Sequence, residues 1–204
     1  MILYGASGHG KVIAEILEAN GVTELAFVDD NPHGRFFLDC PLFHASSLDK
    51  LPPNQVLIAV GNNSIRKRIA SGLNLPFGTA FHPSAQISRR SQLKEGTVVM
   101  AGVIVNSGCE IGRHVILNTN CSVDHDGVIA DFAHLSPKVA LAGDVKVGEG
   151  SHLGIGCCVI QGIRIGKWAT IGAGAVIIAD VPDYAVVVGV PGKIIKYNIP
   201  DEKE

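Results

Sequence analysis

The stretch IGRHVILNTNCSVDHDGVI, residues 111–129, carries a branched aliphatic residue at every sixth position, beginning at Ile111 and ending at Ile129. The same spacing runs without a break from Ile87 to Ile177. A small or slim residue stands two positions before most of these aliphatic residues, and glycine often follows, as at Gly112. A period of six fits neither the 3.6-residue period of a helix nor the simple alternation of a strand. It is typical of a parallel β-helix, in which three hexads form one triangular coil of 18 residues.

In such a coil the aliphatic residues point inward and the small residues fill the corners. We expect the glycines that follow the aliphatic residues to adopt turn conformations that a Cβ would resist. Three of the five cysteines, Cys109, Cys121 and Cys157, occupy small inward positions of their hexads, where they act as core residues.

Length and composition suit a soluble protein of two small domains. The chain has 204 residues and a formal net charge of −2, so no basic surface for nucleic acid is indicated. Neither a signal peptide nor a long apolar segment is seen, which predicts a cytoplasmic protein without membrane insertion.

Residues 1–78 lack the six-residue period. Residues 1–4 read as a buried strand, followed by the glycine turn of residues 5–10 and an apolar helical pattern. A second strand, over residues 25–28, ends at Asp29 and Asp30. After an irregular stretch, a third strand, over residues 56–60, leads into Gly61, Asn62 and a basic helix. This order predicts a small α/β, Rossmann-like βαβ domain over residues 1–78 and a β-helix domain over residues 79–204.

The glycine turn has the spacing G-x-x-G-x-G, which differs from the dinucleotide fingerprint. Its backbone N–H groups, at the start of a helix, suit a pyrophosphate, and Asp29 and Asp30 could accept hydrogen bonds from a ribose or a base. A structural turn and a solvated acid pair account for the same residues equally well.

Four motifs carry a family resemblance: YGASGHG at residues 4–10, VDD at residues 28–30, AVGNNSIRK at residues 59–67 and NTNCSVDHD at residues 118–126. With the hexads, they resemble the PglD- and NeuD-like nucleotide-sugar acetyltransferases of the left-handed β-helix superfamily, nearest to the UDP-4-amino-sugar N-acetyltransferases. The resemblance implies left-handed coiling, a homotrimer with active sites between protomers, and acetyl-CoA as co-substrate. It also implies that the nucleotide sugar is bound by Ser7, Gly8, His9, Gly10, Asp29, Asp30, Gly61 and Asn62.

The expected catalytic residue is His125, which stands outside the inward positions of its hexad. An imidazole that titrates near neutral pH can remove the proton of an attacking amine. In the resembling enzymes the matching histidine is the general base and an adjacent carboxylate orients it. Asp126 takes that place here, one methylene shorter than the family's glutamate, and Asp124 could assist. A solvated surface histidine is the alternative interpretation.

The resemblance assigns acetyl-CoA contacts to His134, Gly143, Ile155 and Ala173, the last of which is glycine in the type enzymes. The Gly143 N–H would stabilise the negative charge on the thioester oxygen. His134 and His152 are 18 residues apart and should stack, but a zinc site needs a third ligand, and His114 is out of register; no metal is expected.

After Asp180 the hexads end, and the segment VGVPGK at residues 188–193 resembles the family's tail beside the adenine of the coenzyme; a simple cap on the last coil explains it as well. The predicted function is N-acetylation of a nucleotide-linked amino sugar, with a UDP-4-amino-4,6-dideoxy sugar as the expected acceptor. O-acetylation of a sialic acid or related sugar, and a non-catalytic trimer that binds sugar nucleotides, are the alternatives.

Overall fold

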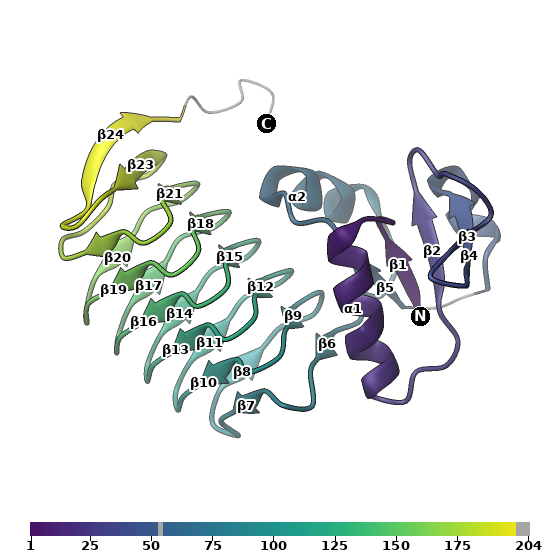
Figure 1. Ribbon diagram of the computed structural model, residues 1–204, viewed down its shortest axis with the longest axis horizontal. Coiled ribbons are helices and arrows are strands. Elements are labelled where there is room, and N and C mark those ends of the chain that lie inside the picture. Colours follow the sequence, from purple (N-terminus) through teal and green to yellow (C-terminus); the bar gives the residue numbers. More distant parts are fainter. Residues whose placement is uncertain (53–54, 199–204) are drawn as a thin grey trace.

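A computed structural model describes residues 1–52 and 55–198 and contains a parallel β-helix with a small α/β unit against one face (Figure 1). The β-helix begins with β6 (Ala80–Phe81). Sixteen two-residue strands follow, and each ends at one of the predicted aliphatic positions. They are β7 (Gln86–Ile87), β8 (Gln92–Leu93), β9 (Val98–Val99), β10 (Ile104–Val105), β11 (Glu110–Ile111), β12 (Ile116–Leu117), β13 (Ser122–Val123), β14 (Val128–Ile129), β15 (His134–Leu135), β16 (Ala140–Leu141), β17 (Lys146–Val147), β18 (His152–Leu153), β19 (Cys158–Val159), β20 (Arg164–Ile165), β21 (Thr170–Ile171) and β22 (Val176–Ile177).

These strands form three parallel sheets, one on each face of a triangular prism. The first face contains β7, β10, β13, β16, β19 and β22, and the second contains β8, β11, β14, β17 and β20. The third face contains β6, β9, β12, β15, β18 and β21 and ends with β23 (Ala185–Val188) and β24 (Lys193–Tyr197). Paired residues are 18 positions apart, as for Ile104 and Ser122, so three hexads make one coil as predicted.

The interior of the prism is the aliphatic column that the sequence predicts. From Val99 to Ile177 every sixth residue is buried, whereas Ile87 and Leu93, in the first coil, are only half-buried. Cys109, Cys121 and Cys157 are buried among them. Among the described residues, this column is the largest of three apolar core clusters, and it holds the outward side chains in fixed register.

The expectation about the glycines that follow the aliphatic residues is wrong. Gly112 has no left-handed φ; a Cβ there would lie 2.6 Å from the backbone nitrogen of Asp131 in the next coil. The left-handed conformation occurs instead three residues after most of the inward aliphatic residues, for example at Gly96 with φ 73° and at Asp126 with φ 61°. These glycines therefore permit close contact between coils, and the turn conformation lies elsewhere.

The N-terminal unit is a five-stranded sheet with two helices. Its elements are β1 (Ile2–Tyr4), α1 (Gly8–Ala19), β2 (Ala26–Asp29), β3 (Phe36–Phe37), β4 (Cys40–His44), the 3₁₀ helix η1 (Ala45–Lys50), β5 (Val56–Ile58) and α2 (Asn63–Gly72). The sheet order is β3-β4-β2-β1-β5, with all neighbours parallel except β3 and β4. The stretch after Asp30 is therefore not wholly irregular: it contains β3 and β4, whose mostly exposed side chains hide the strand pattern.

The N-terminal unit packs on the third face of the β-helix, with α1 and α2 toward the coils and β3 and β4 away from them (Figure 1). One apolar cluster contains Leu3, Ile13 and Leu17 of the unit together with Val98 and Ile116, the outward residues of β9 and β12. The two units thus share a buried apolar contact.

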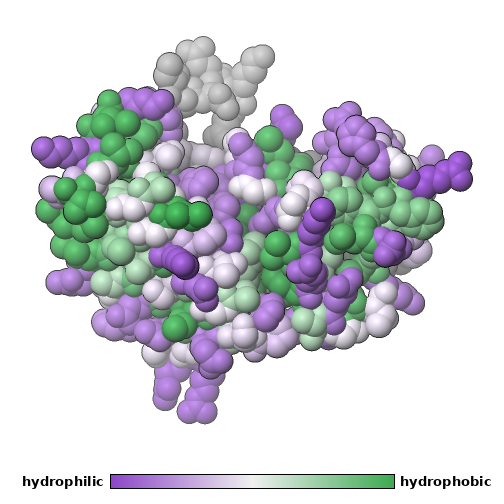
Figure 2. Space-filling view, viewed as in Figure 1, coloured by the Kyte–Doolittle hydropathy of each residue, from purple (hydrophilic) through white to green (hydrophobic). Residues whose placement is uncertain are grey.

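At the far end, hydrophobic side chains gather over β23 and β24 (Figure 2). They include Val190, Ile194, Ile195 and Tyr197, all exposed. Among the described residues, no helix has both the length and the apolar character that crossing a membrane requires.

Candidate active site

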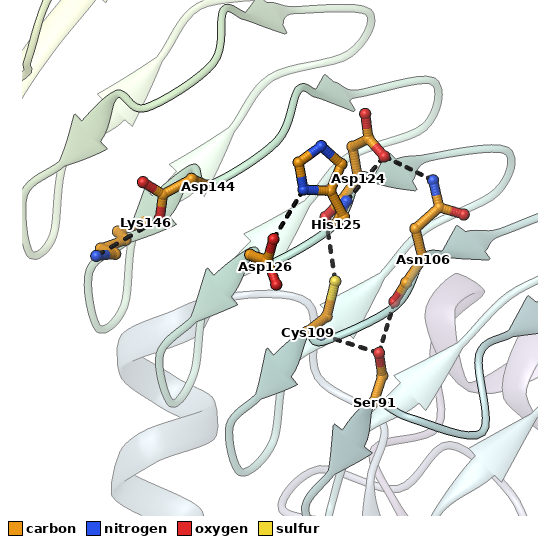
Figure 3. A network of polar contacts seen from close by, with 8 residues as sticks. All are labelled: Ser91, Asn106, Cys109, Asp124, His125, Asp126, Asp144 and Lys146. Atoms are coloured by element: carbon orange, nitrogen blue, oxygen red, sulfur yellow. Dashed lines mark hydrogen bonds and ion pairs between the residues drawn. The ribbon is translucent and has the colours of Figure 1, made fainter.

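His125 lies in the turn that joins β13 to β14, at the corner between the first and second faces (Figure 3). Its side chain is 62% exposed, and its Nδ1 lies 2.8 Å from Oδ2 of Asp126. Asp126 adopts a left-handed φ of 61°, which aspartate tolerates better than most residues. The corner therefore presents an imidazole outward, with its Nδ1 held by a carboxylate and its Nε2 directed away from it.

Asp124 supports this pair from the other side. Its Oδ1 accepts hydrogen bonds from the backbone N–H of His125 at 2.8 Å and from Nδ2 of Asn106 at 2.7 Å. The Asn106 bond and the His125 N–H lower the pKa of Asp124, so its carboxylate stays ionised. The pKa of His125 is raised, first by the hydrogen bond to Asp126 and next by the charge of Asp124. Both expected carboxylates therefore act on the imidazole.

Gly143 occupies the same corner one coil further along. A Cβ at this glycine would lie 2.6 Å from both Cε1 and Nε2 of His125, so the imidazole rests against its backbone. The N–H of Gly143 donates no hydrogen bond within the part of the chain that the structure describes. The structure thus places Gly143, a predicted coenzyme contact, directly beside the predicted base.

A groove of about 560 Å³ runs from His125 across the first face. It is lined by residues of β7, β10 and the turns that follow them, including Gln86, Ser88, Asn106 and Ser107. Most of these lining side chains are short and polar, and the exposed side chain of Ile104 lies among them. The groove gives an extended ligand access to the corner that carries His125.

The predicted nucleotide-sugar residues come together in the N-terminal unit. The turn after β1 and the loop after β5 lie at the same edge of the sheet, where β1 has β2 on one side and β5 on the other. At such a point the strand order reverses direction, and open parallel sheets bind nucleotides in the crevice that forms there. Ser7, Gly8, His9 and Gly10 follow β1, and Gly61 and Asn62 follow β5.

Asp29 and Asp30 lie at the same edge but already have partners. Asp29 Oδ2 accepts a hydrogen bond from the N–H of Ala6 at 2.8 Å, which fixes the glycine turn. Asp30 Oδ1 accepts one from the Tyr4 hydroxyl at 2.7 Å. Asn62 caps α2, since its Oδ1 accepts the N–H of Ile65 at 3.0 Å. Each of these three side chains therefore also has a structural role in this loop cluster.

His134 lies at this nucleotide edge and away from His125. It projects from the third face, 6.5 Å from His9 and stacked on His152 at 4.9 Å between ring centroids. Burial lowers the pKa of His134 to about 3 and that of His9 to about 4, so both are neutral at physiological pH. The stacking predicted for His134 and His152 is confirmed, and the described residues contain no group of three metal-ligating side chains.

Ile155 and Ala173 lie in a third place, the corner between the third and first faces. They are one coil apart, since the N–H of Gly174 donates to the Ile155 carbonyl at 2.8 Å, and both are exposed. Within one chain the predicted coenzyme contacts therefore divide among two corners and one face.

Sequence reasoning did not single out two buried polar residues of α2, Asn63 and Arg66. They belong to the AVGNNSIRK motif and are three positions apart, which places them on one face of the helix. That spacing was the available signal, but it does not distinguish an exposed polar face from a buried one.

Comparisons with known proteins agree with the geometry. The family model described as "PglD N-terminal domain" matches residues 1–73. UDP-N-acetylbacillosamine N-acetyltransferase of Bacillus subtilis (strain 168) is 43% identical over 108 residues, 48% of this chain and about half, 50%, of that relative's length.

Two solved structures resemble nearly the whole chain. The acetyltransferase domain of PglB from Neisseria gonorrhoeae FA1090, in complex with acetyl coenzyme A, is 38% identical, with a TM-score of 0.90, and 95% of this chain and 98% of that chain are covered. A mutant perosamine N-acetyltransferase from Caulobacter crescentus, in complex with CoA and GDP-perosamine, is 37% identical, with a TM-score of 0.92 and 96% of each chain covered. The predicted fold class, a Rossmann-like unit followed by a left-handed β-helix, is confirmed, and the chain belongs to the PglD-type nucleotide-sugar acetyltransferases.

Proposed function

We propose that this chain is an acetyl-CoA-dependent N-acetyltransferase that acetylates the amino group of a nucleotide-linked amino sugar. The observation that carries the proposal is the exposed His125 imidazole, hydrogen-bonded to Asp126 and resting on Gly143 beside an open groove. The similarity to the UDP-N-acetylbacillosamine N-acetyltransferase of Bacillus subtilis, and to the solved structures bound to acetyl coenzyme A or to CoA and GDP-perosamine, supports it.

In the proposed reaction the neutral amine of the sugar attacks the thioester carbonyl while His125 Nε2 accepts the amine's proton. The thioester oxygen becomes negative in the tetrahedral intermediate, where the Gly143 N–H can donate to it. Collapse of the intermediate breaks the C–S bond, and the coenzyme leaves as its thiol after receiving the proton from His125. Asp126 holds the imidazole and stabilises its charged form between these two steps.

The arrangement of one chain favours an active site between protomers of a homotrimer. His125 lies at the corner between the first and second faces, and the nucleotide edge packs on the third face, which is opposite that corner. An acceptor held at the nucleotide edge of one protomer is therefore directed away from that protomer's own His125. A neighbouring prism would supply the histidine, as the family resemblance implies.

The function is tested by comparing acceptors at fixed enzyme and acetyl-CoA concentrations. UDP-, GDP- and dTDP-linked 4-amino sugars, their 4-hydroxy analogues and free sialic acid would be assayed by thiol release and product mass. We expect a 4-amino sugar nucleotide to react fastest, because an amine is the better nucleophile and its cation is attracted to Asp124 and Asp126. Faster turnover of a hydroxy sugar would replace N-acetylation by O-acetylation, and no turnover of any acceptor would favour a binding protein.

Activity should rise with pH through the histidine range, because only the neutral imidazole accepts a proton. The bond to Asp126 raises the pKa of His125, so Asp126→Asn should move the midpoint of kcat/KM for acetyl-CoA to lower pH. The maximal rate should also fall, because the amide orients the ring less well. The substrate amine titrates in the same way in both profiles, so the difference between their midpoints reports on the enzyme. An unchanged midpoint would contradict the role of Asp126.

Asp30→Ala should weaken binding of the nucleotide sugar by about tenfold, the effect of losing one charge-assisted hydrogen bond. Acetyl-CoA binding should be unchanged, which calorimetry with each ligand can measure. Tyr4→Phe is the control, since it removes the 2.7 Å hydrogen bond to Asp30 but keeps the carboxylate. An equal loss for both variants would show that Asp30 only supports the loop.

Mixing two impaired variants, one lacking the base and one with weakened nucleotide-sugar binding, tests the site between protomers. If one protomer supplies His125 and its neighbour holds the acceptor, trimers reassembled from His125→Ala and Asp30→Ala chains contain some intact sites. Random assembly in equal amounts should restore about one quarter of the wild-type sites. Activity at subsaturating nucleotide sugar would be measured after joint refolding, with each variant refolded alone as the control. No recovery would place both groups in one chain.

A further inference from the structure

Helix α2 is attached to the β-helix through a column of backbone carbonyls. Arg66 Nε donates to the carbonyl of His114 at 2.9 Å, and Arg66 Nη2 donates to that of Phe132 at 2.7 Å. Asn63 Nδ2 donates to the carbonyl of Gly150 at 2.9 Å. These three acceptors are 18 residues apart, so they occupy the same corner in three successive coils. Two side chains on one face of α2 thus bind backbone carbonyls that recur at the same corner of successive coils.

The rest of the Arg66 guanidinium binds its own unit. Nη1 donates to the carbonyls of Val60 at 3.0 Å and Gly61 at 3.1 Å, and Nη2 also donates to Oδ1 of Asn63 at 2.9 Å. The five contacts of Arg66 therefore join four backbone carbonyls and one amide oxygen. Arg66 is 1% exposed, and burial lowers its pKa to about 9, which leaves it charged at neutral pH.

This guanidinium connects the acceptor edge to the rigid part of the molecule. Val60 and Gly61 form the loop after β5, the same loop that flanks the predicted nucleotide site. On the other side, the rings of His114 and Phe132 stack at 5.1 Å with an interplanar angle of 7°, so the corner that Arg66 binds is well packed. Moving Arg66 would therefore move the nucleotide loop relative to the coils.

We propose that Arg66, supported by Asn63, is a positioning residue for acetyl transfer: it fixes the nucleotide loop on the β-helix and so sets where the sugar amine meets the catalytic histidine. The inference rests on the proposed function and deepens it. Arg66 touches no reacting atom in this scheme. Its effect is expected because a displacement of about 1 Å between reacting groups lowers rates by about 10²-fold.

Lysine cannot replace arginine in this role. Its ammonium has three donors on a single nitrogen, whereas the contacts of Arg66 require a planar group with five donors pointing in several directions. Arg66→Lys keeps the charge and most of the volume but should leave some of the four buried carbonyls without a donor. The variant therefore separates geometry from charge.

The experiment compares Arg66→Lys and the milder Asn63→Ala with wild type, using the 4-amino sugar nucleotide that wild type acetylates best. Arg68→Lys, the same change at an exposed position of α2, is the matched control. We expect Arg66→Lys to lower kcat by about 10²-fold and Asn63→Ala by about tenfold. Dissociation constants for acetyl-CoA and for the nucleotide sugar should stay within about threefold of wild type, and Arg68→Lys should match wild type.

Hydrogen exchange provides a readout that does not depend on the reaction. Amides of α2 and of the loop at residues 60–62 should exchange faster in Arg66→Lys, while those of the second face stay unchanged. A normal kcat in both variants would overturn the proposal, as would a loss of nucleotide affinity equal to the loss in kcat/KM. If wild type acetylates no nucleotide sugar but the exchange pattern appears, the proposed function fails while the attachment of α2 by Arg66 stands.

Discussion

Replacing His125 with alanine should lower kcat by about 10²–10⁴-fold without unfolding the protein. The rate falls because the attacking amine loses its general base. Stability is preserved because the side chain is 62% exposed and its removal leaves no cavity in the aliphatic core. Steady-state kinetics with acetyl-CoA and the best acceptor would measure the loss, and thermal unfolding would measure stability.

His33→Ala is a suitable control, since His33 is another exposed histidine and lies outside the predicted site. His125→Asn is a second variant that keeps a polar side chain at the corner. A kcat close to wild type in either His125 variant would exclude His125 as the base, and attention would then move to the neutral histidines at the nucleotide edge.

Gly143→Ala should lower kcat by about 10²-fold although it adds only a methyl group. That methyl would lie 2.6 Å from Cε1 and Nε2 of His125, so the imidazole has to rotate away. Because the ring is exposed, it can move at little expense to stability, but it then loses the 2.8 Å contact with Asp126. Gly143 has no left-handed φ, so the backbone itself accommodates alanine.

Two measurements separate this explanation from general damage. The pKa of His125, followed by NMR titration, should fall toward its ordinary value in Gly143→Ala because the hydrogen bond to Asp126 is the largest cause of its increase. The control is Gly72→Ala, where a Cβ meets no atom within 4 Å. Full activity in Gly143→Ala, or an unchanged pKa of His125 together with lost activity, would contradict the mechanism.

The fold of the β-helix could be predicted because its signal is local and repeated. Each hexad forms one short strand and one corner, and position i always lies beside position i+18. The same rule correctly predicted that His134 stacks on His152. It failed for the glycine at position 112, since the six-residue period shows which residues are neighbours but not which backbone angle each one adopts.

The N-terminal unit was less predictable from its residues. Strands β1, β2 and β5 are apolar and buried, and each was expected within two residues of its bounds. Strand β4 was missed because Leu42 is its only buried residue, so neither an apolar run nor an alternating pattern appears. The division of the chain at residue 78 stays a prediction, as do the roles of the individual site residues.

The sequence alone determined the β-helix and the outward position of His125, because both depend on residues related by a fixed period. The family resemblance implied a carboxylate beside His125 and left Asp126 or Asp124 as its source; the structure shows the ring hydrogen-bonded to Asp126. Only the tertiary structure decided that His134 lies beside His9, that the nucleotide edge packs on the face opposite His125, and that Arg66 joins two coils of the β-helix to the loop after β5. The physical reason is that docking one unit on another depends on surface shape and on which carbonyls remain free. Carbonyls belong to every residue, so no side-chain pattern marks the ones that Arg66 binds.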